Sequence, residues 1–175
     1  MSENELQVDA AGIEGTAAAL RRRFDESFAA AALPQTERLE EFLAIRVASD
    51  PYVLGVAEIA GLHVDLKIVA VPSPVSQLLG IVALRGTMVP VYDLAALLDY
   101  PPSARPRWVV LARASQLVGF AFDTFESHLH LPEAAIAARD AQTAAHLGGT
   151  VRAAAAVRPI VRLTSLVELI KGRNS

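Results

Sequence analysis

His128 and His130 are the residues of this sequence whose types and spacing come closest to a chemical site. The spacing His-Leu-His would place both imidazoles on one face of a β-strand, where they could hold a metal ion. Glu126 has the same parity along the chain and could be a third ligand. No nearby run of Asp, Glu or Cys completes a ligand set, so the ordinary interpretation is a pair of exposed strand histidines. We therefore expect neither a metal nor a cofactor, and a metal-dependent enzyme built on these histidines stays open as an alternative.

Signatures of other catalytic sites are missing from the sequence. It contains no G-x-S-x-G motif, no Walker loop and no H-E-x-x-H motif. His63 and Asp65 lie two residues apart, but no nucleophile accompanies them. The chain has no cysteine, which excludes disulfides and thiolate chemistry and fits a reducing compartment. We expect a protein without catalytic residues that is not an enzyme.

Arg85 raises a different kind of question, because it interrupts a strongly apolar segment. The stretch LLGIVALRGTMVPVYDL, residues 78–94, reads as two apolar strands joined by Arg85 and Gly86. Gly86 can supply a turn position with positive φ. An arginine buried without a partner would be very costly, so Arg85 is either a solvated turn residue or a contact for another molecule.

The elements that would position these residues are mostly short strands separated by turn signals. Pro90 lies inside a strand-like run and indicates an edge strand or a bulge, whereas Asp93 is a good N-cap for a short helix over 94–99. Leu147–Thr150, LGGT, reads as a plain turn. The runs typical of strands are 41–47, 52–59, 63–71, 78–84, 87–93, 107–113, 117–123, 124–131, 150–156 and 157–163, and a helix is expected over 164–172.

Part of this pattern occurs twice. PVYDLAALL, which starts at Pro90, matches PIVRLTSLV, which starts at Pro159, and FLAIRVAS from Phe42 parallels WVVLARAS from Trp108. The order and the approximate spacing agree in both halves. The sequence therefore indicates two copies of one strand-rich module, with a cleft between them as a natural binding surface.

Residues 1–35 form a separate arm in this interpretation. From Thr16 to Ala32 the pattern turns helical, with Leu20, Phe24 and Phe28 on one face, and Pro34 ends it. The apolar stripe could pack on the body of the protein or could dock a partner, and the sequence leaves both open.

Charge and hydropathy limit the class of partner. The chain is 53% hydrophobic, with a formal net charge of -3 and no basic stripe, which argues against nucleic acid. The first ten residues do not resemble a signal peptide, and no apolar run reaches the roughly 20 residues of a membrane span. We expect a cytoplasmic protein without direct membrane insertion.

The segment around Arg85 resembles the signature of the CheW-like domain, a G-x-x-N-L-R-G-x-x-x-P-V-x-D-L pattern. The strand LVGFAFD, residues 117–123, and the closing stretch VRPIVRLTSLVELI also resemble the family, so the resemblance covers about Glu41 to Lys171. The residues that fit the signature are Gly80, Leu84, Arg85, Gly86, Pro90, Val91, Asp93 and Leu94.

The resemblance implies a mainly β fold with two SH3-like five-stranded β-barrel subdomains and short helices, to which the arm adds an N-terminal helix. Residues 36–175 would form the CheW-like domain, with the two subdomains intertwined. The implied function is a non-catalytic scaffold adaptor that couples the cytoplasmic tips of methyl-accepting chemoreceptors to the regulatory domain of a CheA-type histidine kinase. Such a protein would be recruited to chemoreceptor arrays at the inner membrane. A kinase-binding decoy or inhibitor in a related chemosensory pathway is an alternative with the same surface.

The resemblance also implies site residues. Arg85 and Gly86, with Ile59 and Leu62, would face the receptor, and Val109 and Leu111 would face the kinase. The sequence departs from the family pattern in places, which leaves open whether flagellar chemotaxis or another pathway is served. Ala83 replaces the usual asparagine, Gly61 replaces a common acidic residue, and Arg162 stands where the first copy has Asp93, so that Thr164 would have to cap the last helix.

Overall fold

The structure is a computed structural model that describes residues 38–138, 144–153 and 156–173. The described chain is mainly β, with two sheets and a few short helices, which confirms the predicted fold class. The predicted helix Thr16–Ala32 lies outside the described residues and stays a prediction.

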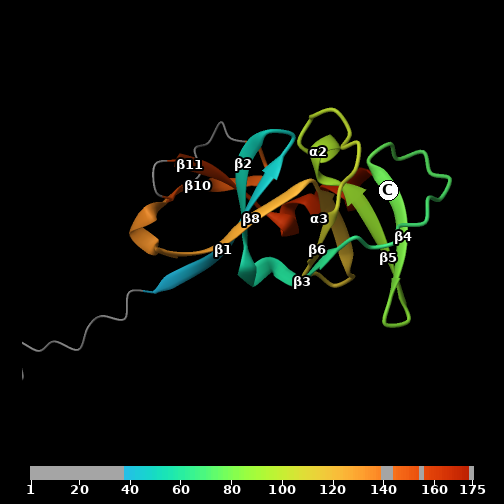
Figure 1. The fold of residues 1–175 in the computed structure, drawn as a ribbon, viewed down its shortest axis with the longest axis horizontal. Coiled ribbons are helices and arrows are strands. Elements are labelled where there is room, and N and C mark those ends of the chain that lie inside the picture. The colour runs from blue at the N-terminus through green and yellow to red at the C-terminus, as the bar shows by residue number, and fades with distance from the viewer. Residues whose placement is uncertain (1–37, 139–143, 154–155, 174–175) are drawn as a thin grey trace, which may run out of the picture. The chain divides into compact units, whose positions relative to one another are not determined.

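The described strands form two sheets. Six strands pair in the order β8-β1-β2-β11-β10-β9, and five pair in the order β3-β6-β7-β5-β4 (Figure 1). The elements are β1 (Leu39–Val47), β2 (Asp50–Gly55), the 3-10 helix η1 (Val56–Glu58), β3 (Ile59–Val64), β4 (Leu78–Leu84), β5 (Thr87–Asp93), α2 (Leu94–Leu97), β6 (Trp108–Ala112), β7 (Val118–Phe122), β8 (Thr124–Pro132), the 3-10 helix η2 (Glu133–Ala135), β9 (Ile136–Ala137), β10 (Leu147–Ala153), β11 (Ala156–Val161) and α3 (Leu163–Arg173).

Both halves of the chain contribute to each sheet, because the first half gives β1 and β2 to the six-stranded sheet and the second half gives β6 and β7 to the five-stranded sheet. β1 and β2 form an antiparallel hairpin, and so do β6 and β7. The strand that follows each hairpin then crosses over, since β3 pairs with β6 and β8 pairs with β1. Both crossed strands are sheet edges, so neither sheet is made from one half of the chain alone.

The segment that appeared as a repeat has the same construction in both halves. β4 and β5 form a hairpin followed by α2, and β10 and β11 form a hairpin followed by α3. In each case the proline-bearing strand also pairs in parallel with the second strand of a hairpin, as Val91 does with Gly119 and Ile160 with Val53. Of the two alternatives predicted for Pro90, the edge strand is wrong, because β5 is an inner strand, whereas a register irregularity does lie close to Pro90, between Leu78 and Gly80 of the paired strand β4. Pro90 is tolerated there because it pairs only with Ile81, and the parallel pairing begins at the next residue.

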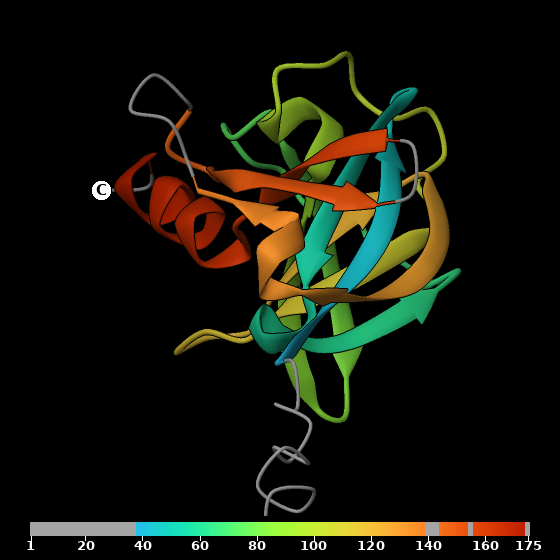
Figure 2. The same cartoon turned by 90° about the vertical axis from the view of Figure 1, so that its left-hand side faces the viewer.

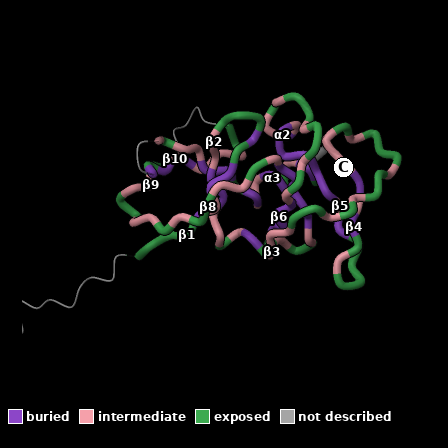
Figure 3. Tube along the Cα trace, in the orientation of Figure 1, coloured by how far each residue is buried: buried purple, intermediate pink, exposed green. Residues whose placement is uncertain are grey.

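Three apolar clusters hold the fold together. One lies within each sheet, and the largest lies between the sheets, where α3 runs (Figures 1 and 3). This shared core includes Phe120 and Phe122 of β7, Leu94 of α2, and Leu163 and Leu166 of α3, all fully buried. Figure 2 shows α3 beside the strands of the six-stranded sheet. Strands with a cluster on either side are apolar on both faces, which explains their continuous hydrophobic runs.

Two local expectations do not agree with the structure. The run 63–71 is a strand only at its first two residues, which end β3; beyond them Val69 makes an isolated bridge to Ile81 of β4. The sequence LGGT begins strand β10 and is not a turn. Glycines there can enter a strand because β10 has a register irregularity between Leu147 and Thr150.

The two helix N-termini are capped in different ways. Asp93 accepts a hydrogen bond from the backbone N–H of Ala95 at 3.0 Å, which confirms it as the N-cap of α2. The cap of α3 comes from Glu58 of η1, whose carboxylate accepts from the N–H of Leu163 at 2.6 Å. Thr164 does not cap the helix, because its hydroxyl donates to Glu58. Neither helix, nor any other among the described residues, is long and apolar enough to cross a membrane.

Candidate functional site

The β4–β5 hairpin presents Arg85 on a tight two-residue turn. Leu84 pairs with Thr87, which leaves Arg85 and Gly86 as the two loop residues. Their φ angles are 48° and 81°, so both are left-handed, as a type I′ turn requires. This turn matches the twist of the two strands and places Arg85 at the end of the hairpin. Figure 1 shows the β4–β5 hairpin extending away from the rest of its sheet.

The end of this hairpin is exposed, whereas its base is anchored in a core. Ala83 and residues 85–88 are all exposed, and Met88 reaches 57% (Figure 3). Val82 and Val89, one step toward the body, are buried in the cluster of the five-stranded sheet. The hairpin therefore offers a positive charge and an apolar side chain on a rigid support.

The backbone conformation of Arg85 is unfavourable for a long side chain, and no polar contact with the rest of the described chain offsets this cost. Left-handed positions favour Gly, Asn and Asp, and a longer side chain there is disfavoured. In the described part of the chain, the guanidinium of Arg85 makes no ion pair or hydrogen bond, unlike those of Arg46, Arg107 and Arg158. Arg85 is thus an exposed positive charge that can pair with a group on another molecule.

Ile59 and Leu62 are not beside the hairpin in the sheet. Both lie on β3, which is the edge opposite to β4, with β6, β7 and β5 between them. Ile59 is 9% exposed and belongs to the shared core, and Leu62 is partly buried against the same core. The pairing order therefore does not unite the four predicted receptor-facing residues in one patch.

Val109 and Leu111 point into the core of the five-stranded sheet. Val109 has no exposed surface and Leu111 is 6% exposed, whereas Val110 and Ala112, which alternate with them along β6, point to the shared core. Side chains this deeply buried are not available to a partner in this fold. The assignment of these two residues to a kinase-facing surface is therefore not supported, and any role they have is to support β6.

Glu126 is not a partner of the two histidines, because a β-bulge turns it away. In the pairing of β8 with β1, Ser127 lies opposite Ala44 and Phe125 opposite Ile45, so Glu126 is the extra residue. An extra residue reverses the alternation of faces, which defeats the parity argument.

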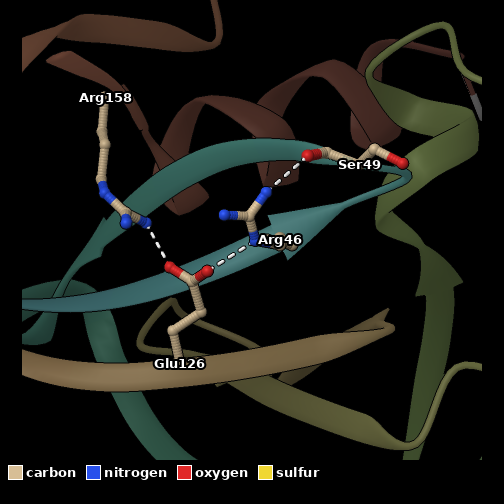
Figure 4. A network of polar contacts seen from close by, with 4 residues as sticks. All are labelled: Arg46, Ser49, Glu126 and Arg158. Carbon is tan, nitrogen blue, oxygen red and sulfur yellow. Dashed lines mark hydrogen bonds and ion pairs between the residues drawn. The ribbon is translucent and has the colours of Figure 1, made fainter. Parts of the chain in front are cut away.

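Glu126 is instead held by two arginines (Figure 4). Its carboxylate lies 2.5 Å from Nη1 of Arg158 and 2.6 Å from Nε of Arg46, which also donates from Nη1 to the carbonyl of Ser49. These contacts, that of Arg158 above all, hold the pKa of Glu126 below its usual range although partial burial opposes this. The group is a structural ion-pair cluster that joins β8, β1 and β11.

Glu41 of β1 occupies the place that the sequence suggested for Glu126. It lies directly opposite His130 in the pairing of β1 with β8, and all three side chains are exposed. The sequence alone gave no reason to choose Glu41, because only the pairing of two strands far apart in the chain brings it near the histidines.

Comparison with known proteins agrees with this architecture. The sequence model of the CheW-like domain matches residues 41–171. Among solved structures, the chain is similar to the crystal structure of the scaffolding protein TtCheW from Thermoanaerobacter tengcongensis, with a TM-score of 0.69 and 20% sequence identity, over 74% of this chain and 93% of that one. A search among curated proteins found no match. The chain therefore belongs to the CheW-like family of chemotaxis scaffold adaptors.

Proposed function

We propose that this protein is a non-catalytic adaptor that binds the cytoplasmic tips of chemoreceptors and the regulatory domain of a CheA-type histidine kinase. Membership of the CheW-like family supports the binding of both kinds of partner and the absence of catalysis. The same membership supports a cytoplasmic protein recruited to receptor arrays.

The observation that carries the proposal is the position of Arg85. A solvated turn residue with no partner would be expected to be Asn, Asp or Gly, because these fit a type I′ turn without strain. Arg85 keeps a left-handed φ of 48° at the exposed end of a hairpin whose base is fixed in a core. Strain of this kind collects at functional positions, and here it holds a cation where a partner can reach it.

The partner that fits this hairpin is a helical receptor tip with carboxylates beside apolar ridges. Arg85 can form a bidentate ion pair with a carboxylate, and Met88 offers adaptable apolar surface close by. Because Ile59 is in the core and β3 lies at the far edge, we centre the receptor contact on the β4–β5 hairpin.

Binding of a receptor-tip fragment, measured by calorimetry with Arg85→Glu and Arg85→Asn, tests this proposal. Both variants should weaken binding at least about tenfold, which is the loss expected when one partner of a close interfacial ion pair is removed. Arg85→Asn should fold as well as the natural chain or better, since Asn suits the turn.

Arg105→Glu is the matched control, because Arg105 is also an exposed loop arginine without an ion pair among the described residues. It applies the same charge change elsewhere and should leave receptor binding within about twofold. Equal loss in Arg85→Glu and Arg105→Glu would mean that only net charge matters, and no loss in either would refute the hairpin as the receptor contact. The kinase domain is titrated in parallel, and its affinity should be indifferent to Arg85.

A further inference from the structure

Three ligand-bearing side chains meet on the outer face of the β1–β8 pair. His128 and His130 lie two residues apart on β8, and Glu41 lies on β1 directly opposite His130. His128 is opposite Leu43, so it is the diagonal neighbour of Glu41, within reach of a long side chain. The bulge at Glu126 precedes this stretch of β8, so the alternation of faces between residues 128 and 131 is regular, with Leu129 and Leu131 turned to the core.

The distances between the ligand atoms fit a single metal ion. Nε2 of His128 is 3.4 Å from Oε2 of Glu41, and Nε2 of His130 is 3.6 Å from Oε1. One ligand atom from each residue lies within 4.8 Å of the other two, and the imidazole rings have centroids 4.4 Å apart. Bonds of about 2.0–2.1 Å in a tetrahedron put neighbouring ligand atoms about 3.3 Å apart, so small rotations of exposed side chains would complete the geometry.

We propose that Glu41, His128 and His130 form a binding site for a divalent transition metal ion of the zinc class. Two imidazoles and one carboxylate are a ligand set that suits Zn²⁺, Ni²⁺ or Cu²⁺, whereas Mg²⁺ and Ca²⁺ prefer oxygen ligands alone. The three residues are 42–51% exposed, so the remaining coordination position faces solvent and water would fill it.

A metal ion at this site would cross-link the edge strand β8 to its neighbour β1. β8 closes one edge of the six-stranded sheet and comes from the other half of the chain than β1. A metal ion that binds both strands is bound only by the paired state, and therefore opposes their separation. This inference does not depend on the proposed adaptor function. The metal site lies on the six-stranded sheet, whereas the β4–β5 hairpin belongs to the five-stranded sheet.

The test is calorimetric titration of the untagged, chelator-treated full chain with ZnCl₂. We expect saturable binding of one ion and a rise in melting temperature of roughly 5–10 °C at a hundredfold excess over the dissociation constant. Glu41→Gln and the double change His128→Ala with His130→Ala should each weaken binding at least about tenfold, a loss seen even for residues that only support a ligand. The absorption spectrum of the Co²⁺-loaded chain gives an independent readout, because imidazole ligands change it.

Two matched variants make the test specific. Glu126→Gln removes the carboxylate of the same strand that the bulge turns away, and His63→Ala removes a histidine of the other sheet. Both should leave the affinity for Zn²⁺ within about twofold. The proposal is overturned if the natural chain shows no saturable binding, if binding survives the loss of both His128 and His130, or if Glu126→Gln weakens binding as much as Glu41→Gln. Melting curves in chelator verify that each variant is folded.

Discussion

Substitution of Glu58 should lower the free energy of unfolding more than substitution of most partly exposed residues. Its carboxylate caps the N-terminus of α3, although Glu58 lies far from this helix in the sequence. It accepts hydrogen bonds from the backbone N–H of Leu163 at 2.6 Å and of Thr164 at 3.4 Å, and from the Thr164 hydroxyl at 3.2 Å. It also forms an ion pair with Arg162 at 2.8 Å. The side chain of Glu58 is only 16% exposed, so water replaces these bonds poorly once they are lost.

The expected cost of Glu58→Ala follows from these contacts. Loss of a helix N-cap costs about 0.5–2 kcal/mol, and the favourable position of a carboxylate at the positive end of the helix dipole contributes about 0.3–1 kcal/mol more. The ion pair adds little, about 0–1 kcal/mol, because the side chain of Arg162 is 51% exposed. We therefore expect Glu58→Ala to lower the free energy of unfolding by about 2–3 kcal/mol, and Glu58→Gln, which keeps an acceptor oxygen, by about half as much.

The measurement is urea denaturation followed by far-UV circular dichroism. Glu168→Gln is the control on the same helix, because Glu168 is 71% exposed and, among the described residues, forms a surface ion pair with Lys171 at 2.9 Å, so its change should stay within about 0.5 kcal/mol. A midpoint for Glu58→Ala equal to that of Glu168→Gln would refute the reasoning, since it would mean that the helix end satisfies its own amides without Glu58.

Other positions give further predictions. Gly80→Ala should cost about 2–4 kcal/mol in urea denaturation, because Gly80 has φ 148° and a Cβ would strike the backbone of the preceding loop, whereas Gly55→Ala, in open space, should stay within about 0.5 kcal/mol. Asp93→Ala should cost about 2–4 kcal/mol by the same assay, since this 1% exposed carboxylate accepts from two backbone amides; a loss under 1 kcal/mol would contradict that role. Burial lowers the pKa of His146 below its ordinary 6.5, so the unfolded chain takes up the proton first and stability falls as the pH drops through 6.5. His146→Asn should therefore lose less stability between pH 7.5 and 5.5 than the natural chain, and identical pH dependence in the two would contradict the assignment.

The sequence predicted what local signals determine. The alternation of apolar residues and the turn residues located most strands, Asp93 was a readable N-cap, and Arg85 with Gly86 marked the hairpin. The repeat was readable because hairpin, proline-bearing strand and helix recur in the same order. These features depend on residues that are neighbours in the chain.

The features that the sequence missed are set by contacts between distant segments. The exchange of β3 and β8 decides which strands are edges, and it places Glu41 beside the histidines. The cap of α3 comes from Glu58, more than a hundred residues away, so no local motif announced it. Val109 and Leu111 could not be recognised as core, because a strand buried on both faces has no polar side to mark its orientation. The bulge at Glu126 carries no glycine or proline, so the reversal of faces was not readable.

The most direct test of the account is whether this chain couples receptor to kinase in a reconstituted system. Autophosphorylation of the CheA-type kinase of the same source is measured with receptor-containing membranes, with and without the protein. Kinase activity should come under receptor control only when the protein is added, and Arg85→Glu should abolish this control while kinase binding persists. Kinase activity that ignores the protein, or that the protein lowers equally with and without receptor, would contradict the role of a coupling adaptor.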